Sequence, residues 1–229
     1  MVFSAAVFGA AQQSSGVKQN ARPEVAVPAA TPAAKKIEND SARFSYEFTQ
    51  PEFYVRHIRI EHDASGHGVI KFERLHDEAV YEEPLELSPA AVTRISDLWQ
   101  ALRFLDSDEN YQSERQYAHL GTMRLKMERD SRRRTAEFNW TNNKDAFALA
   151  NEYRRIADQA ILIFDISVAR ESQPLNTPKL MEEFELQLKR NGLSDPQQLV
   201  PLLRDISTDE HVPLIARNHA LRLIKKIEK

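Results

Sequence analysis

The chain has 229 residues, a length that suits one domain with attachments or two small domains. Hydrophobic residues make up 41% of it and charged residues 28%, so there is enough apolar material for a packed core. The formal net charge of −3 gives no indication of nucleic-acid binding, and the absence of cysteine excludes disulfides, thiolate metal ligands and a cysteine nucleophile.

The N-terminus, MVFSAAVFGAAQQ, is an apolar run that ends in small residues. This pattern is typical of the h-region and cleavage site of a secretory signal peptide, but it lacks a positive n-region and is too short to span a bilayer. We interpret residues 1–11 as the remnant of a signal peptide whose start lies further upstream, with cleavage near Ala11. The sequence therefore predicts a periplasmic or secreted protein; the alternative is an adventitious apolar N-terminus.

Residues 12–42 are rich in Ala, Pro, Gln and Ser and contain almost no large apolar side chains. Such a segment cannot bury enough surface to offset the entropy lost on ordering. We expect it to be a disordered tether that holds a folded domain away from a membrane or wall.

From Arg43 the hydrophobic period becomes two, because Phe44, Tyr46 and Phe48 alternate with polar residues as a half-buried strand requires. Further strands are predicted at 53–62, 69–75 and 79–84, with a turn at 63–68. Ser88 and Pro89 are typical of an N-cap and a first helical position. They begin a helix whose apolar face is predicted to comprise Val92, Ile95, Leu98, Trp99 and Leu102.

A second unit of the same plan follows a polar connection. Strands are predicted at 120–128 and 135–140 around a charged turn at 129–133, which we interpret as a solvated hairpin tip. Trp99 and Trp140 are expected in the core at the end of each unit. A long helix is predicted from about Asn143 to Ala169, although the run 161–166 is also compatible with a strand.

Two hairpin-then-helix units predict an α+β fold over 43–172, with an antiparallel sheet that carries both helices on one face. Residues 176–229 are predicted to form a helical subdomain. Within it, the segment LVPLLRDISTDEHVPLIARNHALRLIKKI resembles a single helical hairpin of the HEAT type. Because repeat stacks need three or more units, we expect this hairpin to pack on the α+β body.

Four of the seven histidines lie in the stretch 56–76. Since residues of equal parity share one face of a strand, His57 is expected to point to solvent and His62 to the core face near the turn. Only His62, Asp63 and His67 can meet at that turn, and His57 and His76 cannot join them. Three ligands from one flexible turn make a weak metal site. We therefore favour a solvated hairpin end, and we predict no metal or cofactor.

The connection 111–119 carries the candidate binding residues, which are Tyr111, Arg115, Tyr117 and His119. Connections often display binding groups, and Tyr and Arg are favoured anchors in recognition surfaces. The alternative is that the two tyrosines pack over the sheet while the charged residues are solvated. If the protein has a ligand surface, this connection is where we expect it.

No Gly-x-Ser-x-Gly elbow, phosphate-binding glycine loop or His-Glu-x-x-His helix occurs in the chain. In its plan of signal, tether, α+β body and helical tail, the chain resembles uncharacterised exported bacterial proteins, a resemblance that implies no activity. We predict a non-enzymatic exported binding or envelope-associated protein, with an envelope protein as the partner to look for. The alternatives are a hydrolase or other enzyme that uses Tyr111, Arg115, His119 and Asp106, and a cytoplasmic scaffold with a HEAT-like tail.

Overall fold

The computed structural model describes residues 42–229, which belong to one compact unit. The predicted signal remnant at 1–11 and the predicted tether at 12–42, except Ala42, lie outside the described residues. Among the helices within 42–229, none combines the length and the apolar character that crossing a membrane requires.

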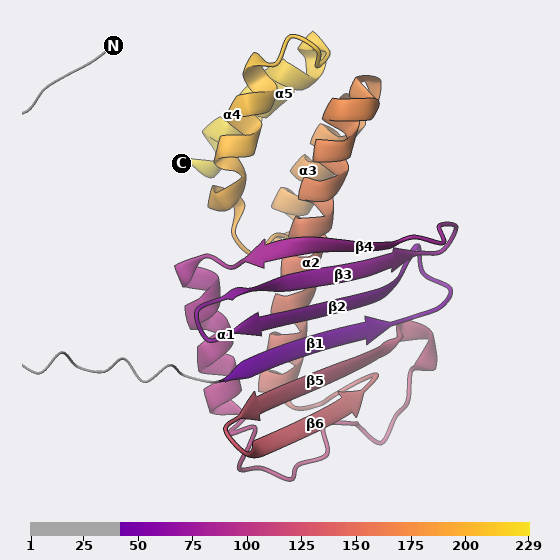
Figure 1. Cartoon of the computed structure of the whole chain (residues 1–229), viewed down its shortest axis with the longest axis vertical. Coiled ribbons are helices and arrows are strands. Elements are labelled where there is room, and N and C mark those ends of the chain that lie inside the picture. Colours follow the sequence, from indigo (N-terminus) through magenta and orange to yellow (C-terminus); the bar gives the residue numbers. More distant parts are fainter. Residues whose placement is uncertain (1–41) are drawn as a thin grey trace, which may run out of the picture. The chain divides into compact units, whose positions relative to one another are not determined.

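One antiparallel sheet of six strands forms the centre of the fold (Figure 1). Its strands are β1 (Arg43–Thr49), β2 (Val55–Asp63), β3 (His67–Arg74), β4 (Val80–Glu86), β5 (Thr122–Arg129) and β6 (Arg132–Phe138). The strand order is β4-β3-β2-β1-β5-β6, so pairing between β1 and β5 joins the two hairpin units into a single sheet. The predicted α+β fold is confirmed.

The core face of the sheet follows from the period-two alternation of the sequence. Tyr46 in β1 lies opposite Ile60 of β2 and Leu125 of β5, and all three side chains are buried. A shift of one residue would turn every such side chain to solvent, so burial fixes the register. At Gly68 the register also requires glycine, because a Cβ atom there would lie 1.9 Å from the backbone oxygen of Glu61.

Two helices, α1 (Pro89–Ala101) and α2 (Lys144–Ser172), cover the same face of the sheet (Figure 1). The predicted cap of α1 is present, since the Ser88 hydroxyl accepts a hydrogen bond from the N–H of Ala91 at 3.1 Å. Asn143 caps α2 in the same way. Because α2 is helical throughout, the strand alternative for 161–166 is wrong.

The C-terminal part is helical and contains α3 (Thr177–Lys189), α4 (Val200–Thr208) and α5 (Leu214–Ile227). Two short 3-10 turns, η2 (Pro174–Asn176) and η3 (Pro196–Leu199), lie directly before α3 and α4, and a third, η1 (Ala118–Leu120), lies before β5 in the α+β body. Helix α2 belongs to two hydrophobic clusters, because Ile156 and Ile161 face the sheet cluster whereas Leu162 and Ile166 face the cluster of the tail helices. The long helix therefore connects the α+β body with the tail.

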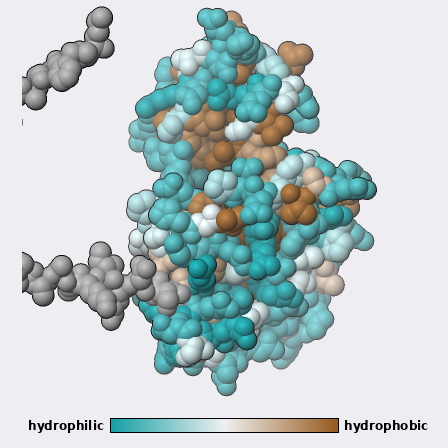
Figure 2. All heavy atoms as spheres, viewed as in Figure 1, coloured by the Kyte–Doolittle hydropathy of each residue, from teal (hydrophilic) through white to brown (hydrophobic). Residues whose placement is uncertain are grey.

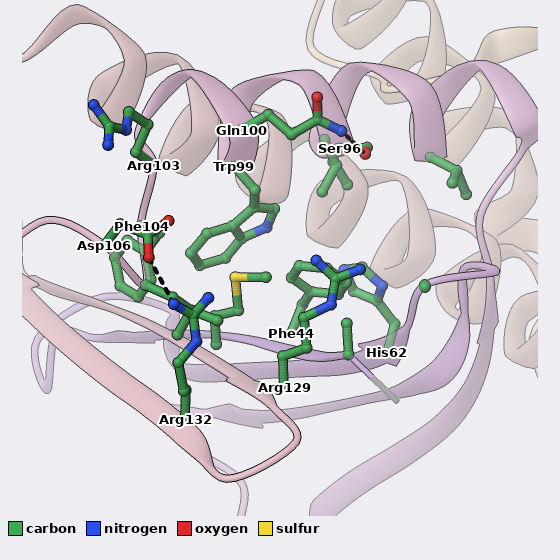
Figure 3. A pocket seen from close by; sticks show the side chains of 16 residues that line it. Phe44, His62, Ser96, Trp99, Gln100, Arg103, Phe104, Asp106, Arg129 and Arg132 are labelled. Carbon is green, nitrogen blue, oxygen red and sulfur yellow. Dashed lines mark hydrogen bonds and ion pairs between the residues drawn. The ribbon is translucent and has the colours of Figure 1, made fainter. Parts of the chain in front are cut away.

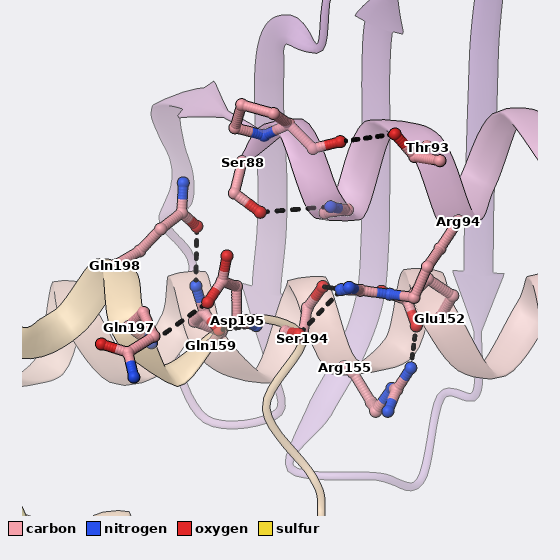
Figure 4. Close-up of polar contacts among 12 residues, drawn as sticks. Ser88, Thr93, Arg94, Glu152, Arg155, Gln159, Ser194, Asp195, Gln197 and Gln198 are labelled. Atoms are coloured by element: carbon pink, nitrogen blue, oxygen red, sulfur yellow. Dashed lines mark hydrogen bonds and ion pairs between the residues drawn. The ribbon is translucent and has the colours of Figure 1, made fainter. Parts of the chain in front are cut away.

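A buried carboxylate strengthens this connection (Figure 4). The side chain of Glu152 in α2 is only 2% exposed, and it accepts hydrogen bonds from Arg94 Nη2 at 2.9 Å and from the Ser194 hydroxyl at 2.7 Å. Arg155 bonds the second carboxylate oxygen, and Arg94 also donates to the backbone oxygen of Ser194 at 2.8 Å. The network thus ties α1, α2 and the loop before η3 together.

Two sequence predictions about the second unit are corrected. Trp140 is 37% exposed and not in the core, because Phe138 fills the last inward position of β6 and the chain leaves the sheet after it. The turn between β5 and β6 is also shorter than predicted. It consists of Asp130 and Ser131, and Asp130 adopts a positive φ of 55°, so Arg129 and Arg132 belong to the strands.

Candidate functional site

A cavity of about 340 Å³ lies between α1 and the sheet, at the end where β1 begins (Figure 3). We call it the α1 cavity. Its apolar lining comes from four segments that are distant in the sequence: β1, α1, the turn after α1, and β5. The main apolar lining residues are Phe44, Val92, Ile95, Trp99, Phe104 and Met127.

Trp99 is the centre of the apolar lining. Its ring packs edge-on against Phe104 with a centroid distance of 4.6 Å, and it is tilted against Phe44 at 5.5 Å. Trp99 is held in place by its indole N–H, which donates a hydrogen bond to the hydroxyl of Tyr153 at 3.1 Å. The aromatic wall is therefore fixed, and it suits the apolar part of a ligand.

The opposite side of the α1 cavity is cationic. Arg129 and Arg132 reach from the β5–β6 hairpin toward α1 (Figure 3), and Arg103 also lines the cavity. Asp106 is the one carboxylate among the lining residues, and it bonds Arg132 Nη1 at 2.6 Å. Arg132 is paired with Asp106, Arg129 also has an interaction partner, and the Arg103 guanidinium points away from the cavity (Figure 3). Arginine nevertheless outnumbers carboxylate among the lining residues, and this composition favours an anionic ligand group.

A buried chain of hydrogen bonds lies at the edge of the cavity and involves His62, Tyr153 and Trp99. His62 Nδ1 is 2.7 Å from the backbone oxygen of Asp63, so that nitrogen donates and Nε2 accepts from the Tyr153 hydroxyl at 2.8 Å. Burial lowers the pKa of His62 and raises the pKa of Tyr153, and both groups are held neutral. Their polar atoms already have partners, so they serve structure.

This arrangement separates His62 from the other two metal candidates, Asp63 and His67. His62 points into the core, whereas the Asp63 carboxylate caps the turn by accepting hydrogen bonds from the N–H groups of Ser65 at 2.9 Å and His67 at 3.0 Å. The His67 ring bonds the Ser65 hydroxyl at 2.7 Å. Across residues 42–229, no group of three or more His, Cys, Asp or Glu side chains is placed to hold a metal ion.

The four candidate binding residues of the 111–119 connection have different environments. Tyr111 is only 2% exposed, and its ring stacks on Phe104 at 6.1 Å, so it belongs to the core. Tyr117 and His119 lie together, with ring centroids 6.0 Å apart, and His119 is exposed. Arg115 is exposed as well. None of the four lines the α1 cavity, so they do not form a site with Asp106.

Sequence reasoning missed the α1 cavity. Phe44 and Trp99 were correctly assigned to inward positions, but nothing in the sequence shows that both rings line a cavity together with the β5–β6 hairpin. Arg129 and Arg132 were interpreted as part of a solvated tip. The one available signal was their place in a charged turn between two predicted strands; the structure puts this turn at the sheet end where β1 begins.

No protein-family model matches this sequence, and no curated protein matches it.

Proposed function

We propose that this chain is an exported, non-enzymatic binding protein that holds a small organic anion with an apolar body in the α1 cavity. The observation that carries the proposal is the pairing of a fixed aromatic wall, centred on Trp99, with the arginines Arg129 and Arg132 in one cavity. Small-molecule sites commonly combine a mostly apolar lining with a few placed polar groups.

The dimensions and chemistry of the cavity define the ligand class. Its volume of about 340 Å³ lies near the lower end of the range for small-molecule sites, roughly 300–1,000 Å³. An aliphatic or aryl carboxylate fits, with its apolar part against Trp99 and its carboxylate at the guanidinium groups. Arginine suits this role because its planar fork matches a carboxylate in a bidentate geometry.

Two further features support the rest of the proposal. The polar groups beside the aromatic wall, His62 and Tyr153, have their hydrogen-bonding atoms engaged by each other, by Trp99 and by the backbone, which favours binding over acid–base catalysis. Export is supported by the apolar start of the sequence and by the Ala/Pro-rich composition of residues 12–42.

A tryptophan titration tests ligand binding. The Trp140→Phe variant leaves Trp99 as the single tryptophan, located in the cavity wall. We expect decanoate to change the Trp99 fluorescence with saturation. Decylammonium, which has the same number of carbon atoms and the opposite charge, should have no such effect. The double variant Arg129→Gln/Arg132→Gln should weaken decanoate binding by about tenfold or more, because charge-assisted bonds are lost. Arg133→Gln, in the same hairpin but outside the cavity lining, is a single-charge control.

Equal responses to decanoate and decylammonium, or equal affinities of the double variant and the Arg133→Gln control, would contradict the proposal. Export is tested separately, by fusing residues 1–42, preceded by an added positively charged n-region, to a reporter that is active only after export. A reporter retained inside the cell would refute this part.

A further inference from the structure

A second hollow, of about 470 Å³, lies where the end of β4 faces the middle of α2. We call it the β4 hollow. Apolar atoms are visible in the recess between the sheet and the upper helices (Figure 2). It is separate from the α1 cavity, because no residue lines both.

The wall of the β4 hollow is an apolar stripe on α2. Ala160, Ile163, Phe164 and Val168 follow each other at helical spacing and face the hollow together with Leu85 of β4. Val168 is 40% exposed, so part of this stripe has no cover. An exposed apolar stripe at the bottom of a recess indicates a contact site for an apolar side chain.

The rim of the β4 hollow is acidic. Glu83 and Glu86 of β4 and Glu171 of α2 line it, and none of these three side chains forms an ion pair in the described part of the chain. The residues that line the hollow include no lysine, arginine or histidine. Among the residues that the structure describes, the negative charge of the rim is therefore uncompensated, and a positively charged binding partner would be complementary to it.

The backbone of β4 limits how such a partner can bind. β4 is an edge strand, but Pro84 at its centre has no N–H group to offer, and the backbone oxygen of Glu86 already accepts from the side-chain amide of Gln198 at 3.2 Å. A regular additional strand is thus disfavoured. Binding must rest on side chains, with an apolar anchor in the hollow and cations at the rim.

We propose that the β4 hollow binds a basic peptide segment of a partner protein, in which a large apolar side chain is flanked by lysine or arginine. The apolar anchor packs against Ile163 and Phe164, and the flanking cations lie next to Glu83, Glu86 and Glu171. This surface is independent of the anion site in the α1 cavity and carries the opposite charge.

The probe is a fluorescein-labelled peptide of six residues, in which two central leucines are flanked on each side by two lysines. Its binding to the full chain is measured by fluorescence anisotropy. We expect saturable binding that weakens between 50 and 500 mM salt, because the Debye length shrinks from roughly 14 Å to roughly 4 Å over that range. A peptide with glutamates in place of the lysines, and one with serines in place of the leucines, should not bind.

Three variants locate the peptide site. The triple variant Glu83→Gln/Glu86→Gln/Glu171→Gln should lower the affinity about tenfold, since three partly exposed charge pairs of modest strength are lost. The matched triple Glu52→Gln/Glu78→Gln/Glu114→Gln changes the net charge equally at positions outside the hollow and should leave the affinity unchanged. Ser167→Trp, at an exposed helix position that lines the hollow, should block it and abolish binding.

Equal affinities of the two triple variants would overturn the proposal. So would retained binding in Ser167→Trp, provided that circular dichroism shows the variant to be folded, or equal binding of the lysine and glutamate peptides. The Arg129→Gln/Arg132→Gln variant should bind the peptide normally, so failure of either binding proposal is recognised independently of the other.

Discussion

Replacing Glu152 by alanine removes the carboxylate to which Arg94, Arg155 and Ser194 all donate. Breaking a buried ion pair by removing one partner costs roughly 3–5 kcal/mol. Here the partners Arg94 and Arg155 are 38% and 27% exposed, so their guanidinium groups can rehydrate. We therefore expect a loss of stability at the lower end of that range, about 3 kcal/mol.

The assay is reversible thermal and urea unfolding followed by circular dichroism. For a unit of this size, each kcal/mol shifts the melting temperature by about 2–4 °C, so Glu152→Ala should lower it by about 6–12 °C. Ser194→Ala, which removes one donor, should cost roughly 1.5 kcal/mol.

The double variant Glu152→Ala/Ser194→Ala gives the sharpest test of the network. Because both single changes remove the same hydrogen bond, their effects should overlap by about 1 kcal/mol or more. A loss below 1 kcal/mol for Glu152→Ala, or strict additivity in the double variant, would refute the reasoning that this carboxylate ties the tail to the α+β body.

Four further substitutions have defined outcomes. Tyr153→Phe leaves the indole N–H of Trp99 and the Nε2 atom of His62 without partners, and it should cost about 2–4 kcal/mol in urea unfolding. Burial raises the pKa of Asp158 from 3.8 to about 6, and the nearby Arg154 opposes this shift. The folded state therefore favours the protonated carboxyl. This contribution of Asp158 to the free energy of unfolding is complete below pH 3.8 and is lost as the pH rises through 6. Asp158→Asn should therefore raise the melting temperature at pH 7.5, with little change at pH 3.5; an equal effect at both values would contradict this linkage. Gly68→Ala places a methyl group against the backbone of Glu61, and it should prevent soluble expression or strongly reduce the melting temperature. In Gly192→Ala the new methyl group meets only the flexible side chain of Gln187 at close range, so the melting temperature should change little.

The sequence predicted those parts of the fold that depend on local pattern. Alternation in β1 gave the strand and its inward face, and Ser88 followed by Pro89 gave the start of α1, because period and cap chemistry are properties of neighbouring residues. The pairing of β1 with β5 could not be predicted in the same way, since it joins segments that are separated by the first helix.

The α1 cavity and the Glu152 network could not be predicted from the sequence, because both are formed by packing between segments that are distant in the chain. Glu152 occupies the same helical stripe as Leu149 and Ile156, and a charge on an apolar stripe was the available signal for a buried network. Tyr111 and Trp140 show the limit of residue-type arguments, because the tyrosine expected at a binding surface is buried and the tryptophan expected in the core is partly exposed.

A crystal structure of the protein with decanoate tests the proposed binding of an organic anion. We expect ligand density in the α1 cavity, with the alkyl chain against Trp99 and the carboxylate within hydrogen-bond distance of Arg129 or Arg132. An empty α1 cavity at saturating decanoate, or a ligand bound in the reverse orientation with its carboxylate against Trp99, would contradict it.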